Sequence, residues 1–130
     1  MVFTTAATDA AAWLLAFQSA VASRDLEAGR HLFAEDVQAY GTRSAAMSGL
    51  DALVTRQWQP IWTATSAFRF TGVDYEASVG STCVVAAQWE SFSASGQRRQ
   101  GRSTLVLSGR PLRCVHSHFS MLPTDAGRID

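Results

Sequence analysis

The 130-residue sequence has few of the features that mark a disulfide scaffold, a nucleic-acid binder or a membrane protein. It contains two cysteines and three prolines, and its 11 basic residues balance its 11 acidic ones. A chain without net charge has no field to attract phosphate backbones or anionic lipid, so we expect neither nucleic acid nor membrane as a partner. No apolar run reaches the roughly 20 residues of a membrane-spanning helix.

The cysteines and the first residues favour a cytoplasmic protein. Cys83 and Cys114 lie in apolar, strand-like stretches, whereas a small disulfide scaffold would place them in loops, so we interpret both as reduced core residues. Residues 1–9 have no basic region before a long apolar stretch, and no signal peptide is expected. No repeat, linker or low-complexity segment divides the chain, so we predict one domain over residues 1–130.

The first half of the sequence has apolar residues at helical spacing. Residues 8–23 form the clearest case, with Thr8 as the N-cap and Asp9 well placed against the helix dipole. A shorter helix is predicted after Asp25, followed by a short strand over 37–41 and a turn at 42–44.

A third helix is predicted from a capping box, in which Ser48 bonds a free backbone amide and Asp51 bonds back. Pro60 should kink or end this helix, because proline has no amide hydrogen and clashes with the preceding turn. Its apolar face comprises Leu50, Leu53, Val54, Trp58, Ile61 and Trp62.

The second half alternates with a period of two, which is typical of β-strands. Four runs follow one another over residues 68–76, 81–93, 97–108 and 112–121, and glycine-containing turns separate or end them. Consecutive strands joined by short turns form an antiparallel meander, and the three preceding helices are available to cover one face. The predicted fold class is therefore α+β.

Three segments carry a resemblance to a known family. Residues 25–28 with 32–37, residues 101–104, and the strand 115–120 resemble the NTF2-like superfamily, and within it the SnoaL-like and ketosteroid-isomerase-like domains of small bacterial proteins. The resemblance covers residues 8–123. It implies a cone-shaped barrel of curved, antiparallel or mixed sheet that encloses a pocket with its helices, and a homodimer formed through the outer sheet face.

The same resemblance disfavours ketosteroid isomerisation. The isomerases' general-base aspartate falls at Gly41 of this sequence, and their oxyanion tyrosine falls at Phe17. Glycine carries no base and phenylalanine carries no acidic proton. Since this fold hosts many chemistries as well as binding modules, the family alone does not define a reaction.

The last strand contains the leading catalytic candidates, His116 and His118. Regular alternation places both on one face with Cys114, and Phe119 on the other. Hydrophobicity does not decide which face is inward, because the Phe119 face could also form a dimer interface. The resemblance places the histidine face toward the pocket, where the two histidines could be a general acid/base and its orienting partner. The alternative is that His118 is a hydrogen-bonded structural histidine and that His116 lies near the rim.

The same strand suggests two further chemical roles. A metal shared by the two histidines would need a third ligand, and only the distant His31 or an unplaced acid is available, so we expect no metal and no cofactor. Cys114 beside His116 could be a thiol nucleophile, but no orienting acid or oxyanion donor is identifiable.

Arg102 is the third catalytic candidate. It shares strand parity with Val106, so it points inward if Val106 is a core residue. It could clamp a carboxylate or enolate of a ligand, or it could pair with Glu90. The predicted pocket walls are Tyr40, Trp58, Trp62, Trp89, Phe17 and Cys114.

These features predict a homodimeric protein that binds a small, apolar or carboxylate-bearing organic molecule. If it is an enzyme, cofactor-free proton transfer is expected, as a lyase, isomerase or cyclase. The alternative is a non-catalytic binding or oligomerisation module.

Overall fold

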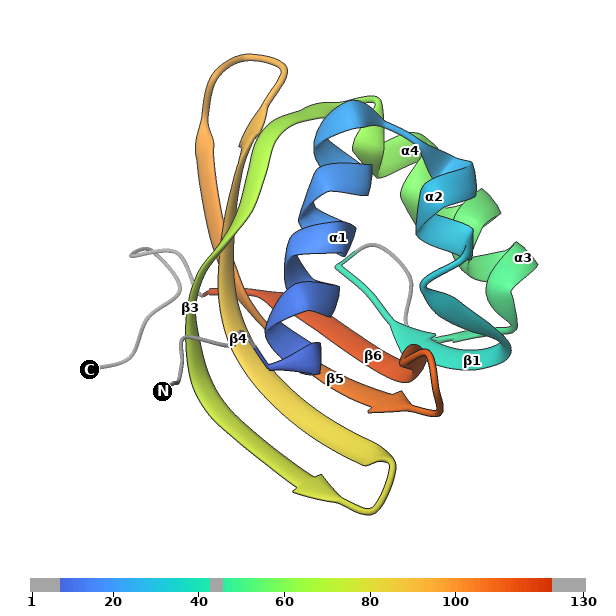
Figure 1. The fold of residues 1–130 in the computed structure, drawn as a ribbon. Helices are drawn as coiled ribbons and strands as arrows, with labels where there is room; N and C mark the ends of the chain where they lie inside the picture. The colour runs from blue at the N-terminus through green and yellow to red at the C-terminus, as the bar shows by residue number, and fades with distance from the viewer. Residues whose placement is uncertain (1–7, 43–45, 123–130) are drawn as a thin grey trace.

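Helices pack inside the bend of a strongly curved sheet in the computed structural model, which describes residues 8–42 and 46–122 (Figure 1). This is the predicted α+β arrangement. Two residues of the predicted turn at 42–44, Arg43 and Ser44, lie outside the described residues. The elements are α1 (Asp9–Ser23), α2 (Leu26–Arg30), β1 (Phe33–Tyr40), β2 (Met47–Ser48), α3 (Leu50–Leu53), the π-helical turn η1 (Val54–Trp58), α4 (Gln59–Trp62), β3 (Thr65–Val79), β4 (Thr82–Ser93), β5 (Arg98–Ser108) and β6 (Arg113–Met121).

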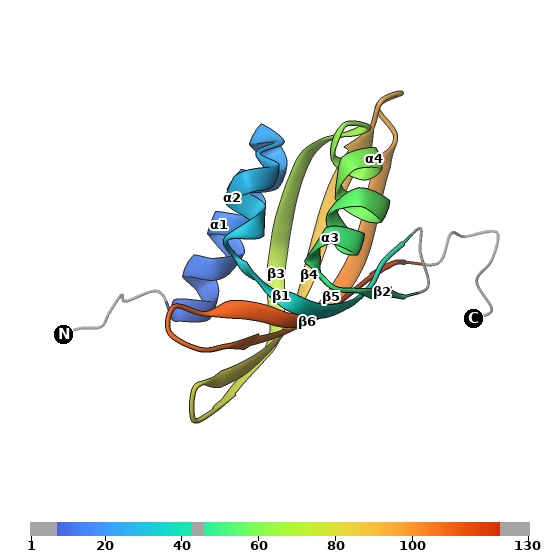
Figure 2. The same ribbon diagram turned by 90° about the vertical axis from the view of Figure 1, so that its right-hand side faces the viewer.

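The sheet has six strands in the order β2-β1-β6-β5-β4-β3. Strands β3 to β6 form the predicted antiparallel meander, and β1 adds to it by pairing parallel to β6. A view turned by 90° shows α1 and α2 as one helical group and α3 and α4 as another, both on the same side of the sheet (Figure 2). The core lies between these helices and the concave sheet face.

Helix α1 follows its sequence signals closely. The Thr8 hydroxyl accepts a hydrogen bond from the Ala11 amide at 3.0 Å, as an N-cap should. The helix ends at Arg24, whose backbone adopts a left-handed conformation and whose amide bonds back to the carbonyls of the last turn. The residues at helical spacing are buried, so this prediction is confirmed.

The segment from α3 to α4 begins and continues differently from its prediction. Ser48 belongs to β2, and its hydroxyl donates to Gln38 Oε1 at 2.9 Å, so the N-cap is Gly49, without a side-chain cap bond. The predicted capping box is therefore wrong. The helix also continues through Pro60 to residue 62, because the turn before the proline widens: the Gln59 amide bonds the Val54 carbonyl, five residues back.

A β-bulge interrupts the regular alternation of β6. Val106 of β5 lies opposite His116, whereas the next residue, Leu107, lies opposite Cys114. Val115 is the extra residue between them. Since one inserted residue sends all later side chains of a strand to the opposite face, the bulge reverses the facing of β6 from His116 onward.

No helix within residues 8–42 and 46–122 combines the length and the apolar character that crossing a membrane requires.

Candidate functional site

A cavity of about 560 Å³ lies between the helices and the concave sheet face. Its volume is within the range of small-molecule sites. Residues from the helices, from β1 and from all four strands of the meander line it. Seven of the lining side chains are aromatic: Phe17, Phe33, Trp58, Trp62, Phe68, Trp89 and Phe119.

The tryptophans of the cavity are held in place by local geometry. Trp58 and Trp62 lie one helical turn apart and stack, with ring centroids 4.6 Å apart and an interplanar angle of 17°. Trp89 lies against Gly101 on the neighbouring strand, where an added Cβ would come within 2.3 Å of the indole. The Trp89 indole N–H donates to the Arg102 carbonyl at 3.3 Å. Gly101 is thus required by the close approach of the indole on one side and of a backbone carbonyl of β6 on the other.

Polar side chains also line the cavity, and three of them are buried. Ser91 and Ser117 are buried on the sheet side, and Gln57 is buried on the helix side at 8% exposure. The Gln57 Oε1 has no hydrogen-bond partner among the described residues. Because buried polar atoms in native proteins are almost always paired, this oxygen is the most unusual group in the site.

The described lining contains no aspartate, glutamate, histidine, cysteine or tyrosine, and its charged members are Arg98 and Arg99. A cavity with this lining offers no general acid or base near neutral pH. Nor do three metal-binding side chains gather anywhere in residues 8–42 and 46–122.

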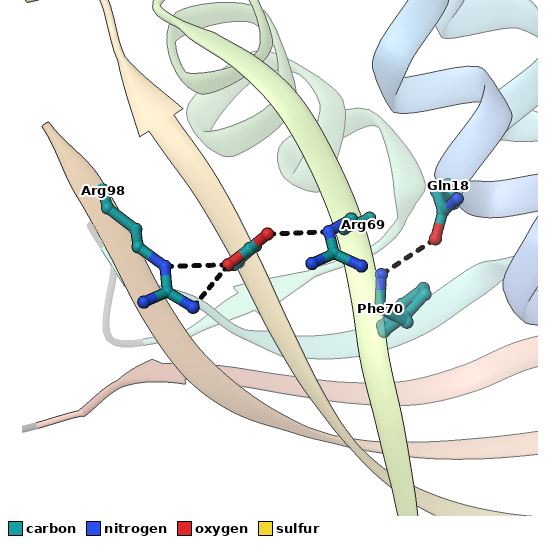
Figure 3. A network of polar contacts seen from close by, with 5 residues as sticks. Gln18, Arg69, Phe70 and Arg98 are labelled. Carbon is teal, nitrogen blue, oxygen red and sulfur yellow. Dashed lines mark hydrogen bonds and ion pairs between the residues drawn. The ribbon is translucent and has the colours of Figure 1, made fainter. Parts of the chain in front are cut away.

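Arg98 is engaged by a carboxylate. Its Nε donates to Glu90 Oε1 at 2.8 Å, and Arg69 Nε donates to Glu90 Oε2 at 2.7 Å, so two strands converge on one acid (Figure 3). These bonds, first from Arg69 and then from Arg98, hold the pKa of Glu90 below its ordinary value. Beside this network the Phe70 amide donates to Gln18 Oε1 at 2.8 Å, which joins β3 to α1 (Figure 3).

The structure places His116 and His118 on the outer face of the sheet, which corrects the predicted orientation. The bulge at Val115 is the reason, because it turns Ser117 and Phe119 inward in place of the histidines. Ser117 is buried and lines the cavity, whereas His118 is exposed. The two histidines therefore lie together, but outside the cavity.

Arg102 also faces outward, contrary to its predicted orientation. Leu105 and Leu107 are fully buried, so the odd-numbered positions of β5 face the core. The even-numbered positions, Arg102 and Val106 among them, therefore face outward. The side chain of Arg102 is exposed, and Glu90 pairs with Arg69 and Arg98 instead. The condition for an inward arginine, a core Val106, is not met.

Two of the predicted wall residues do not line the cavity. Tyr40 is exposed on the outer face beside the two histidines. Cys114 is buried on the inner side of the bulge, where burial raises the pKa of its thiol to about 12, and the thiol donates to the His116 carbonyl at 3.1 Å. Such a thiol is not a nucleophile at neutral pH. The other four predicted walls, Phe17, Trp58, Trp62 and Trp89, do line the cavity.

The lining residues that the sequence interpretation did not place in the pocket include Gln57, Ser117 and Phe119. Gln57 carried a usable signal, because it falls three residues after Val54 and four before Ile61, within the apolar face of the predicted helix. A polar residue in such a position is a candidate site residue. Ser117 carried no comparable signal, since only the bulge turns it inward, and Phe119 lay on the strand face whose direction hydrophobicity left undecided.

Comparison with known proteins agrees with this architecture. The model of the SnoaL-like domain family matches residues 14–110, and the chain belongs to that family. The match ends before β6, the strand with the two histidines. No protein of curated function gives a significant match.

Solved structures with the same fold have low sequence identity to this chain. An NTF2-like protein of unknown function from Pseudomonas putida KT2440 has a TM-score of 0.75 at 15% identity, over 93% of this chain and 90% of its own. An NTF2-like superfamily protein from Salmonella enterica serovar Typhimurium has a TM-score of 0.73 at 16% identity, over 88% and 89%. A protein from Thiobacillus denitrificans, described as a putative calcium/calmodulin-dependent protein kinase type II association domain, has a TM-score of 0.70 at 20% identity, over 86% and 94%. These similarities establish the NTF2-like fold.

Proposed function

We propose that this protein binds a small, largely apolar organic molecule with at least one ring in the aromatic cavity. The observation that carries the proposal is the lining itself, in which aromatic rings from helices and strands surround a cavity of about 560 Å³. Aromatic walls with a few placed polar groups are the usual construction of a small-molecule site. Ring-to-ring contacts with the tryptophans and phenylalanines would hold the ligand.

Binding, without proton transfer by the strand histidines, is the activity that we propose. The earlier case for a lyase, isomerase or cyclase rested on His116, His118 and Arg102 facing the pocket, and all three lie on the outer face. The described lining offers no carboxylate or imidazole in their place. The site supports the binding alternative better than the catalytic one.

A fluorescence titration with N-phenyl-1-naphthylamine tests the proposal, because this neutral apolar dye brightens when it leaves water. We expect saturable binding with a micromolar dissociation constant. The blocking variant is Ala64→Trp, since Ala64 is exposed and lines the cavity, and it should weaken binding at least about tenfold.

Thr63→Trp is the matched control, because Thr63 is an exposed neighbour that does not line the cavity. It should bind the dye as the wild type does. The proposal fails if the wild type shows no saturable binding, or if the two tryptophan variants bind equally well.

A further inference from the structure

Gln57 lies in the cavity wall with an unsatisfied oxygen. It belongs to η1, and Pro60 follows this widened turn two residues later. Its side chain is more than nine-tenths buried, and Oε1 has no partner within the described part of the chain. An acceptor that has given up water without gaining a protein donor is costly, so a donor from the cavity would satisfy it. Single π-helical turns within α-helices are also frequent at functional sites.

Gly41 provides the space that the Gln57 amide occupies. A Cβ added at Gly41 would lie 1.4 Å from Gln57 Oε1 and 2.3 Å from the amide carbon. Gly41 does not have a positive φ angle, so an unusual backbone conformation does not explain the glycine. The lack of a side chain, which leaves room for the Gln57 amide, does. The Gln57 amide therefore fills the space that a side chain at position 41, directly after β1, would otherwise occupy.

We propose that Gln57 is the polar residue that selects the ligand, by accepting a hydrogen bond from an O–H or N–H group of an otherwise apolar aromatic molecule. The inference rests on the proposed binding function. In the structure Oε1 lies against Gly41, and rotation about the terminal side-chain bond, which is soft in glutamine, would exchange Oε1 and Nε2 and turn Oε1 toward the cavity. An amide carries no charge and transfers no proton at neutral pH. The ligand class is therefore neutral phenol-, indole- or enol-like compounds, which are bound and released without chemical change.

The test compares two probes that differ in one donor. 2-Naphthol and 2-methoxynaphthalene share a ring system, but only 2-naphthol can donate a hydrogen bond. Each is titrated in competition with N-phenyl-1-naphthylamine, and the ratio of the two dissociation constants is compared between variants, so that differences in ring hydrophobicity cancel. In the wild type we expect a preference of about tenfold for 2-naphthol.

Gln57→Leu should reduce this preference to about one while leaving 2-methoxynaphthalene binding nearly unchanged. Gln59→Leu is the matched control, because Gln59 is exposed on the same helical segment and should keep the full preference. Gln57→Leu should also leave the melting temperature unchanged or higher, since it removes a buried unpaired acceptor.

Gly41→Ala is a second route to the same result, with Gln57 still present. The new Cβ displaces the end of a flexible side chain, so the fold should survive while the amide loses its position. We expect the preference for 2-naphthol to fall in this variant too.

The outcomes separate the two proposals. If the dye binds but the wild type has no preference, or if Gln57→Leu keeps the preference, the role of Gln57 is overturned and the binding function stands. If the dye does not bind to the wild type, the proposed binding function is wrong, and the proposed role of Gln57 is wrong as well.

Discussion

Tyr40 and His118 lie directly opposite each other on the parallel strands β1 and β6, with their ring centroids 5.7 Å apart and the rings nearly perpendicular. Tyr40 meets His116 in the same way at 5.6 Å. The three rings therefore form one edge-to-face cluster on the outer face of the sheet. That face is where the family resemblance places a homodimer interface, and the homodimer stays a prediction.

This cluster predicts that the histidines do not contribute to ligand binding in the cavity. His118→Ala should leave the affinity for N-phenyl-1-naphthylamine within about twofold of the wild type. Phe119→Ala, one residue further along the same strand, should weaken it about tenfold, because Phe119 is half-buried and lines the cavity. An equal loss of dye affinity in both variants would mean that the histidine face of β6 contributes to the site. It would contradict the assignment of that face to the outside of the sheet.

Cys114 is expected to be chemically inert in the folded protein. Its thiol has a pKa of about 12 because of burial, so almost no thiolate forms at pH 8. In Cys83→Ser, which leaves Cys114 as the single cysteine, reaction with 5,5′-dithiobis(2-nitrobenzoic acid) should be at least about a hundredfold slower in buffer than in denaturant. Rapid labelling of the native variant would show that β6 opens at the bulge or that the thiol is accessible.

The Arg69–Glu90–Arg98 network should make stability depend on acid pH. The two arginines lower the pKa of Glu90 from its ordinary 4.5, so the folded state holds the ionised carboxylate more favourably than the unfolded state does. This contribution is present above pH 4.5 and is lost as the pH falls through the lowered pKa. Denaturant unfolding between pH 7 and pH 3 should show a loss of stability that is smaller in Glu90→Gln.

A control for this prediction is Glu35→Gln, which removes an exposed carboxylate without an ion pair among the residues that the structure describes. Its stability should fall with pH as the wild type's does. If Glu90→Gln also loses stability with the wild-type slope, the network contributes nothing to the acid response.

Local sequence signals predicted the elements wherever one period extended over many residues. Helix α1 and the four meander strands were identified in this way, and differences at strand ends were a few residues. The capping box failed because Ser48 pairs with Gln38 between β2 and β1. Pro60 does not end the helix, and the π-helical turn before it is the local irregularity of that segment.

The candidate site was predictable only in its apolar part. Trp58, Trp62 and Phe17 are on the inner faces of helices, and helical spacing alone indicates those faces. The polar part was misplaced because His116, His118 and Arg102 were oriented by an uninterrupted alternation and by resemblance. Gln57 was overlooked because the apolar face of its helix was assembled from apolar residues alone.

The last strand of the sheet, β6, shows what the sequence determined and what only the tertiary structure decided. The sequence by itself determined that residues 112–121 form a strand and that the chain is an α+β domain with an apolar core, because periodicity and propensity are local properties. Only the tertiary structure decided that Ser117 and Phe119 face the cavity while the histidines face outward. A bulge is defined by pairing with β5 and β1, so its position at Val115 depends on contacts between strands and leaves no periodic trace in the strand's own sequence.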